Sequence, residues 1–396
     1  MPENSQLLQL LRQNNPALAG FHARTGDRGL ADEVRFPFLA LVGQAEMKLA
    51  LILALVNPGI GGVLLIGPRG TGKTTAVRGL VDLMPVVQRS TCPNGCDPQA
   101  AEVEGMDGVC NECAAKLIRG EPITAPDRMR LVELPLNARL EDVVGGINER
   151  VAMEQHKVRL ERGLLTAADQ NLLYVDEVNL LADEIADAIL DAAAQGIYTV
   201  SRGPLAATYR ARIVLVGSMN PEEGKLRPQI QDRFGLRVLV RGLADSKDRL
   251  QVYRRVAAYQ ANPRALRALW AGETLAVAQE ITQARAHLPQ VRLSPQVERA
   301  GMAWIKRLGI DSHRAEVVLF EAARAHAAAD ARTRADLADL RAVGTLALRQ
   351  RRSSFMREYF SSQQDEEREI AAVVRGKAGD KYRASNAKSQ KTVSRR

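Results

Sequence analysis

The stretch GPRGTGKT, residues 67–74, decides the fold of this chain. It follows the apolar run Val63–Ile66 and precedes a segment of helix-forming residues, so the pattern predicts a buried strand, a tight loop and a helix. Glycines in the loop let successive backbone N–H groups face an anion at the helix N-terminus. We therefore expect a phosphate-binding loop. The residues expected to surround the phosphates are Gly67, Pro68, Arg69, Gly70, Thr71, Gly72, Lys73, Thr74 and Thr75.

A second apolar run, LLYVDE at 172–177, ends in two acids. It predicts a buried parallel strand whose carboxylates emerge at the carboxyl end, where open α/β sheets bind ligands. With a phosphate loop upstream, Lys73 is expected to bind the β and γ phosphates of ATP. Thr74 and Asp176 would hold its Mg²⁺, and Glu177 would activate the attacking water. The alternative is an acidic strand end that caps the next helix.

Two further polar residues follow a third buried strand, predicted at 213–218. Asn220 lies just beyond this strand, where its amide can hydrogen-bond the γ-phosphate or the attacking water. Arg233 ends a short segment, LRPQIQDRF at 226–234, and is a candidate arginine finger acting on a neighbouring subunit's nucleotide. The alternative for Arg233 is a surface ion pair.

The composition is that of a soluble globular protein, with 46% hydrophobic and 26% charged residues among 396. The longest apolar run, Leu49–Val56, is far short of the roughly 20 residues that cross a bilayer. The start of the sequence lacks a secretory pattern, so we expect a cytoplasmic protein without membrane insertion. The net charge is +9, and residues 375–396, with eight Lys or Arg and one Asp, contribute +7 of it. The remaining residues carry only +2, so nucleic acid is not an expected partner of the body.

The pattern divides the chain into four parts. Residues 1–34 are expected to form a loosely ordered extension, and 35–244 an α/β domain with a parallel sheet flanked by helices. An all-helical domain is expected at 245–355, with Val317, Phe320, Ala323 and Ala327 on a buried helix face. The segment 356–396 ends in the basic tail, which is expected to be disordered. Helices of the second domain are predicted at 246–261, 263–287, 294–308, 312–330 and 333–351.

All four cysteines lie in an insertion at about residues 90–120. Cys92 and Cys96 form one close pair, and Cys110 and Cys113 form a second. Two such pairs resemble the knuckles of a zinc ribbon, in which four thiolates surround a structural Zn²⁺. Reduced thiols in an exposed insertion are the alternative, and a cytosolic disulfide is a further one.

The order of these motifs resembles the AAA+ ATPases. Several blocks are similar to the ATPase (I) subunit of magnesium chelatase, and together they span about residues 36–350. The most specific block is NPEEGKLRPQIQDRFGL at 220–236; the others are GPRGTGKT, RLVELPLNA at 130–138, LLYVDEVNLL at 172–181, GIDSHRAE at 309–316 and the segment 36–44.

This resemblance implies roles for further residues. Asn220 would be the first sensor, Arg233 the finger presented to a neighbour, and Arg314 the lid arginine that senses nucleotide. Val42, Gly43 and Gln44 would lie near the adenine. Family members form rings, commonly hexamers, and act with a larger subunit carrying an integrin-like domain and with a porphyrin-binding subunit.

The implied function is an ATP-driven motor for insertion of Mg²⁺ into protoporphyrin. A MoxR-like ATPase that matures a metalloprotein is the first alternative, because it keeps the motor and changes the client. A nucleic-acid-binding scaffold that uses the basic tail is the second, and it requires affinity that falls steeply with salt.

Overall fold

The computed structural model describes most of the chain between Val34 and Arg352. The described residues are 34–92, 95–147, 160–202, 205–352, 363, 366–368, 370, 371 and 374. Most of the predicted N-terminal extension and the whole basic tail at 375–396 lie outside them, so both remain predictions. Among the described residues, no helix is long and apolar enough to cross a membrane.

Five parallel strands form the central sheet, in the order β11, β1, β10, β7, β4. The carboxyl ends of parallel strands lie at one edge of a sheet, so β1, β7 and β10 bring the predicted motifs together. The strand β11 was not expected from the sequence. The strands are β1 (Val63–Ile66), β4 (Leu131–Glu133), β7 (Leu172–Val175), β10 (Val214–Met219) and β11 (Leu236–Leu239).

Alternate residues of each strand enter two separate cores, one on each face of the sheet. In β1, Val63 and Leu65 face the first core, while Leu64 and Ile66 face the second. The first core is covered by α2 (Ala45–Val56) and α3 (Lys73–Gly79). The second is covered by α6 (Leu140–Val144), α8 (Leu164–Ala167), α9 (Asp183–Gln195) and α10 (Pro228–Arg233). The predicted α/β fold class is confirmed.

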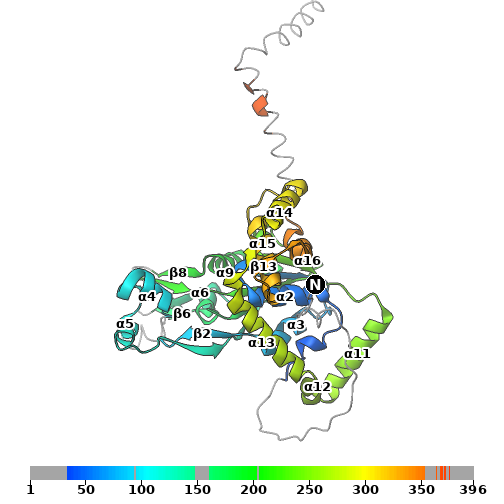
Figure 1. Cartoon of the computed structure of the whole chain (residues 1–396), viewed down its shortest axis with the longest axis horizontal. Coiled ribbons are helices and arrows are strands. Elements are labelled where there is room, and N and C mark those ends of the chain that lie inside the picture. Colours follow the sequence, from blue (N-terminus) through cyan, green and yellow to red (C-terminus); the bar gives the residue numbers. More distant parts are fainter. Residues whose placement is uncertain are drawn as a thin grey trace, which may run out of the picture.

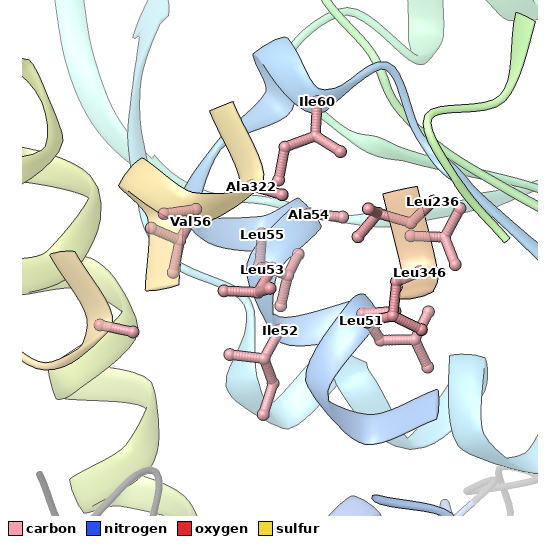
Figure 2. Packing of buried hydrophobic residues seen from close by; sticks show 14 of the residues in the cluster. Leu51, Ile52, Leu53, Ala54, Leu55, Val56, Ile60, Leu236, Ala322 and Leu346 are labelled. Carbon is pink, nitrogen blue, oxygen red and sulfur yellow. The ribbon is translucent and has the colours of Figure 1, made fainter. Parts of the chain in front are cut away.

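The helical lid packs directly on the first core. Figure 2 shows Leu51–Val56 of α2 packed near Leu236 of the sheet and two lid residues, Ala322 and Leu346. Because α2 is enclosed by the sheet and the lid, it is apolar around most of its circumference. The lid elements are α11 (Ser246–Ala261), α12 (Pro263–Leu269), α13 (Ala271–His287), β12 (Arg292–Leu293), α14 (Pro295–Leu308), α15 (Arg314–Ala329), β13 (Arg334–Ala335) and α16 (Leu337–Leu348).

Three antiparallel ribbons extend the body on one side. The ribbon of β2 (Val86–Ser90) and β3 (Thr124–Arg128) carries α4 (Pro98–Glu104) and α5 (Asn111–Ile118), which lie at the left end of the view in Figure 1, beside β8. The other two ribbons are β5 (Gly145–Ile147) with β6 (Leu160–Arg162), and β8 (Ile197–Arg202) with β9 (Leu205–Arg210).

Two local predictions were wrong. The helix expected at 263–287 is broken at Trp270, whose ring is buried and packs under Arg255 at 5.3 Å. Val317 was expected in the lid core but is 56% exposed, because its neighbours Val318 and Leu319 fill the core positions.

A buried carboxylate joins the last two lid helices. Asp339 is fully buried in α16, its Oδ1 lies 2.7 Å from His326 Nδ1, and its Oδ2 accepts a hydrogen bond of 2.8 Å from Arg332. Burial alone would raise the pKa of Asp339, but the hydrogen bonds from His326 and Arg332 outweigh it and lower the pKa to about 2.

This network predicts acid sensitivity of the lid. The folded-state pKa of Asp339 lies below the ordinary value of 3.8, so its stabilisation is full above pH 3.8 and is lost as the pH falls towards 2. The loss amounts to roughly 2 kcal/mol. Asp339→Asn should lower the midpoint of urea unfolding at pH 7 and flatten its dependence on pH between 4 and 2. The exposed Asp311→Asn is the control, and equal behaviour of the two variants would contradict the assignment.

Candidate active site

The phosphate loop is an open cradle at the end of β1. Gly70 and Gly72 have φ of +75° and +84°, and a Cβ at either position would meet no atom within 4 Å because that side faces a cavity of about 340 Å³. At Gly67 the opposite holds, since a Cβ would lie 2.1 Å from the carbonyl oxygen of Val240. Glycine is therefore favoured at 70 and 72 by the positive φ, and it is required at 67 by the close approach of the backbone.

Lys73 begins α3 and points back into the loop. Its Nζ donates hydrogen bonds to the carbonyl oxygens of Gly67 at 2.6 Å and Pro68 at 2.8 Å. Burial lowers the pKa of Lys73, and the charge of Asp176 opposes that shift. The ammonium group therefore lies inside the cradle, where an anion can replace the two carbonyl oxygens as its partner.

The carboxylate of Asp176 accepts hydrogen bonds from side chains of α3, β7 and β10. Thr74 donates to Oδ2 at 3.2 Å, Tyr174 donates to Oδ1 at 2.9 Å, and Ser218 donates to Oδ1. Thr74 and Asp176 together offer the hydroxyl and carboxylate oxygens that Mg²⁺ prefers, so these residues fit the expected metal. Sequence reasoning missed Tyr174 and Ser218, although both lie within the predicted strands.

Glu177 lies at the mouth of the cavity in contact with charged neighbours. Its carboxylate is 3.4 Å from Arg69, and Arg69 also pairs with Glu223. Asn220 donates a hydrogen bond of 2.8 Å to Glu223. The hydrogen bond from Asn220 and that from Arg69 lower the pKa of Glu223. Glu177 itself has φ of +50°, an uncommon conformation for a residue with a side chain.

A second cavity of about 580 Å³ shares Gly70, Thr71, Gly72 and Thr75 with the first. Val42 and Gln44 line it, together with apolar residues of α11. Gly43 has φ of +60°, and a Cβ there would lie 2.7 Å from the Leu243 side chain. A phosphate cradle continuous with a more apolar cavity fits a nucleotide whose base enters the second cavity.

Arg233 and Arg314 do not line the phosphate cavity. Both line a third cavity of about 350 Å³, where Arg314 begins α15 and the exposed Val317 follows one turn later. Arg233 pairs with Asp191 of α9. Among the described residues, the two predicted arginines thus line one cavity together, and Lys73 lines a different one.

Asp232, next to Arg233, is the point where the lid meets the end of the sheet. Its carboxylate accepts hydrogen bonds from Arg351 at 2.9 Å and Ser312 at 3.1 Å, both of which belong to lid segments. Buried Arg237 of β11 contributes a third contact at 3.4 Å. A movement of the lid would therefore be transmitted to the helix that carries Arg233.

The four cysteines form one compact cluster. Their Sγ atoms all lie within 4.8 Å of one another. Three of them, Cys92, Cys96 and Cys113, are buried, and Cys110 is half-buried. Convergence of two sequence pairs on one buried point is the arrangement expected for a metal-binding cluster.

The comparisons with known proteins agree with this geometry. An AAA lid domain model matches residues 305–373, and an MCM P-loop domain model matches residues 147–237. A magnesium-chelatase subunit ChlI homolog from Methanocaldococcus jannaschii is 42% identical over 323 residues, which cover 81% of this chain and 87% of that protein. The chain belongs to the ChlI family of magnesium-chelatase subunits. It is a AAA+ ATPase.

A second member of the family, the magnesium-chelatase 38 kDa subunit of Cereibacter sphaeroides, is 41% identical over 317 residues. The match covers 80% of this chain and 92% of that protein. A crystal structure from Cytophaga hutchinsonii of a protein classed as an ATPase has a TM-score of 0.50 and 18% identity, and covers 79% of this chain and 83% of that one. That likeness supports the fold.

Two substitutions separate ATP binding from hydrolysis. Lys73→Ala should weaken ATP binding at least tenfold, because it removes the charge inside the phosphate cradle. Glu177→Gln should bind ATP with nearly unchanged affinity but lose hydrolysis by about 100-fold or more, since the amide cannot take a proton from water. Binding of a fluorescent ATP analogue and phosphate release measure the two effects. Normal turnover by Glu177→Gln would remove Glu177 from its catalytic role.

Proposed function

We propose that this protein is the ATP-hydrolysing motor of a magnesium chelatase, working in the cytoplasm to drive insertion of Mg²⁺ into protoporphyrin by partner subunits. The observation that carries the proposal is an ATP-site geometry of the AAA+ type in a chain about 40% identical to magnesium-chelatase subunits along nearly their whole length. The Mg²⁺ inserted into the porphyrin is cargo and is separate from the ion that accompanies ATP.

Each residue of the site has a distinct task in hydrolysis. The loop N–H groups and Lys73 bind the phosphates, while Thr74 and Asp176 hold the metal. When bound, Mg²⁺ neutralises charge on the β and γ phosphates. Glu177 orients a water and accepts its proton as the oxygen attacks the γ-phosphorus. Asn220 positions the γ-phosphate or that water through its amide.

In a ring of subunits, proposed to be a hexamer, a neighbouring subunit supplies a further positive charge, Arg233, to each ATP site. Arg233 lies outside the cavity that holds Lys73 of its own chain, which supports action on the nucleotide of a neighbour. Arg314 shares its cavity and is proposed to act at the same joint. Val317, exposed beside them, supplies an apolar contact for the adjacent subunit. ATP bound at the joint is therefore touched by two chains.

The partners proposed are a larger subunit with an integrin-like domain and a porphyrin-binding subunit that performs the metal insertion. The cofactors are ATP with its Mg²⁺ and, at the four cysteines, a structural Zn²⁺. The resemblance in the sequence supports the two partners.

Reconstitution tests the chelatase assignment. The purified protein, mixed with an integrin-like-domain subunit, a porphyrin-binding subunit, ATP, Mg²⁺ and protoporphyrin, should produce Mg-protoporphyrin, followed by its fluorescence. Glu177→Gln is the matched control and should reduce the product to background, because it binds ATP without hydrolysing it. Robust ATPase activity without any metallated porphyrin, under conditions where a known chelatase motor works, would contradict the proposal and favour another client.

A further inference from the structure

The cysteine insertion between β2 and β3, here called the arm, has a hydrophobic core too small to stabilise its fold. It hangs on the ribbon of β2 and β3, in which Ser90 pairs with Thr124 and the intervening residues form α4 and α5. Among its described residues, five form a buried apolar cluster, namely Cys92, Cys96, Val109, Cys113 and Ile123. Units of about 40 residues with so little core generally need a metal or disulfides for stability.

The backbone around the cysteines is shaped to present four sulfurs to one point. Between the first pair, Gly95 turns the chain with φ of +69°, and its N–H donates to the carbonyl oxygen of Cys92 at 3.3 Å. This left-handed turn directly precedes Cys96. Cys110 caps α5, which places Cys113 in the first turn of that helix.

The cluster also has the polar contacts of a thiolate site. The N–H of Cys110 donates to Cys96 Sγ at 3.2 Å, and Ser90 Oγ lies 3.3 Å from Cys92 Sγ. Tetrahedral Zn²⁺ with Zn–S bonds of about 2.3 Å needs sulfurs about 3.8 Å apart. The observed limit of 4.8 Å requires only a small contraction to reach that spacing. Four sulfur ligands leave no open position, so the metal has a structural role.

One residue of the arm ties it to the ATPase body. Asp97 directly follows Cys96, and its Oδ2 accepts a hydrogen bond of 2.6 Å from Arg212 and lies 3.2 Å from Arg210. Arg210 ends β9 and Arg212 precedes β10. Arg212 is also held by Asp169, with its backbone N–H bonded at 2.9 Å.

This contact lies at the start of the strand that ends in the active site. Ser218 near the other end of β10 binds Asp176, and Asn220 follows the strand. Asp97 also meets the foot of the ribbon formed by β8 and β9. Asp97, whose position is fixed by its neighbour Cys96, therefore contacts residues that hold both the β8–β9 ribbon and strand β10.

We infer that Cys92, Cys96, Cys110 and Cys113 bind one Zn²⁺, and that this metal fixes Asp97 as an anchor joining the arm to Arg210 and Arg212. The zinc site is a part of the proposed function, but this inference does not depend on a porphyrin client. Loss of the metal frees Asp97 from its position. The foot of the β8–β9 ribbon then loses its attachment to the arm.

The experiment combines metal analysis with hydrogen exchange on the full chain. Mass spectrometry of the protein purified under reducing conditions should find about one zinc per chain and little iron. Cys113→Ser should lose the zinc while still binding ATP, because the nucleotide site draws on separate cores. Protein with four reduced thiols that neither contains zinc nor takes it up from solution would overturn the metal site.

Asp97→Asn tests the anchor separately, since it leaves all four cysteines in place. It should retain zinc, yet amide exchange at residues 205–212 should become about tenfold faster, as expected when a charge-assisted hydrogen bond is lost. Removal of zinc from the unaltered protein should have the same effect on this segment. Asp107→Asn, an exposed acid of the same arm, is the control. Unchanged exchange at 205–212 in Asp97→Asn would overturn the anchor and leave the zinc result standing.

Discussion

The hydrogen bonds that converge on Asp176 depend on the parallel order of β1, β10 and β7. Thr74 lies in α3, the helix that follows β1, Ser218 belongs to β10, and Tyr174 belongs to β7, which ends one residue before Asp176. A slip of one residue in β7 or β10 would turn Tyr174 or Ser218 away from Asp176. A slip in any of the three strands would also exchange the side chains that face the two cores. The same register thus maintains the two hydrophobic cores and the proposed site for the metal of ATP.

The parts predictable from sequence were those with a strong local pattern. The phosphate loop and the strand ending in Asp176 combine an apolar run with residues of a restricted type, so both their structure and their place at the sheet edge could be predicted. The strand β11 contains the buried Arg237, which interrupts its apolar run, so the sequence pattern did not predict a strand there. That arginine is accommodated because it donates to the carbonyl oxygens of Arg349 and Gln350 at the end of the lid. Burial lowers its pKa to about 10, chiefly through desolvation.

The arrangement of distant segments could not be predicted from local pattern. Nothing in the sequence near Arg314 indicates that it shares a cavity with Arg233, because that proximity depends on how the lid packs on α2 and β11 (Figure 2). The exposure of Val317 has the same origin. Likewise, the cysteine spacing suggested a metal, but the attachment of its arm through Asp97 required the fold.

Under the proposed function, the catalytic residues belong to two faces of one subunit. One face carries Lys73 and Asp176, which would bind ATP and its metal, and the other carries Arg233 on a helix that Asp232 links to the lid. In a closed ring with heterologous contacts, every joint brings the first face of one chain to the second face of the next. Hydrolysis at a joint can then change the lid of the neighbour through Asp232.

The central claim is that each ATP site is completed by the next subunit, and mixing two inactive variants tests it most directly. Glu177→Gln lacks the catalytic carboxylate, and Arg233→Ala lacks the finger, so each alone should be inactive while still binding ATP. In rings assembled from equal amounts, about a quarter of the joints combine an intact Glu177 with an intact Arg233, and ATPase activity should return to about that fraction. Full activity of Arg233→Ala alone, or mixtures that stay inactive although mixed rings form, would contradict the account.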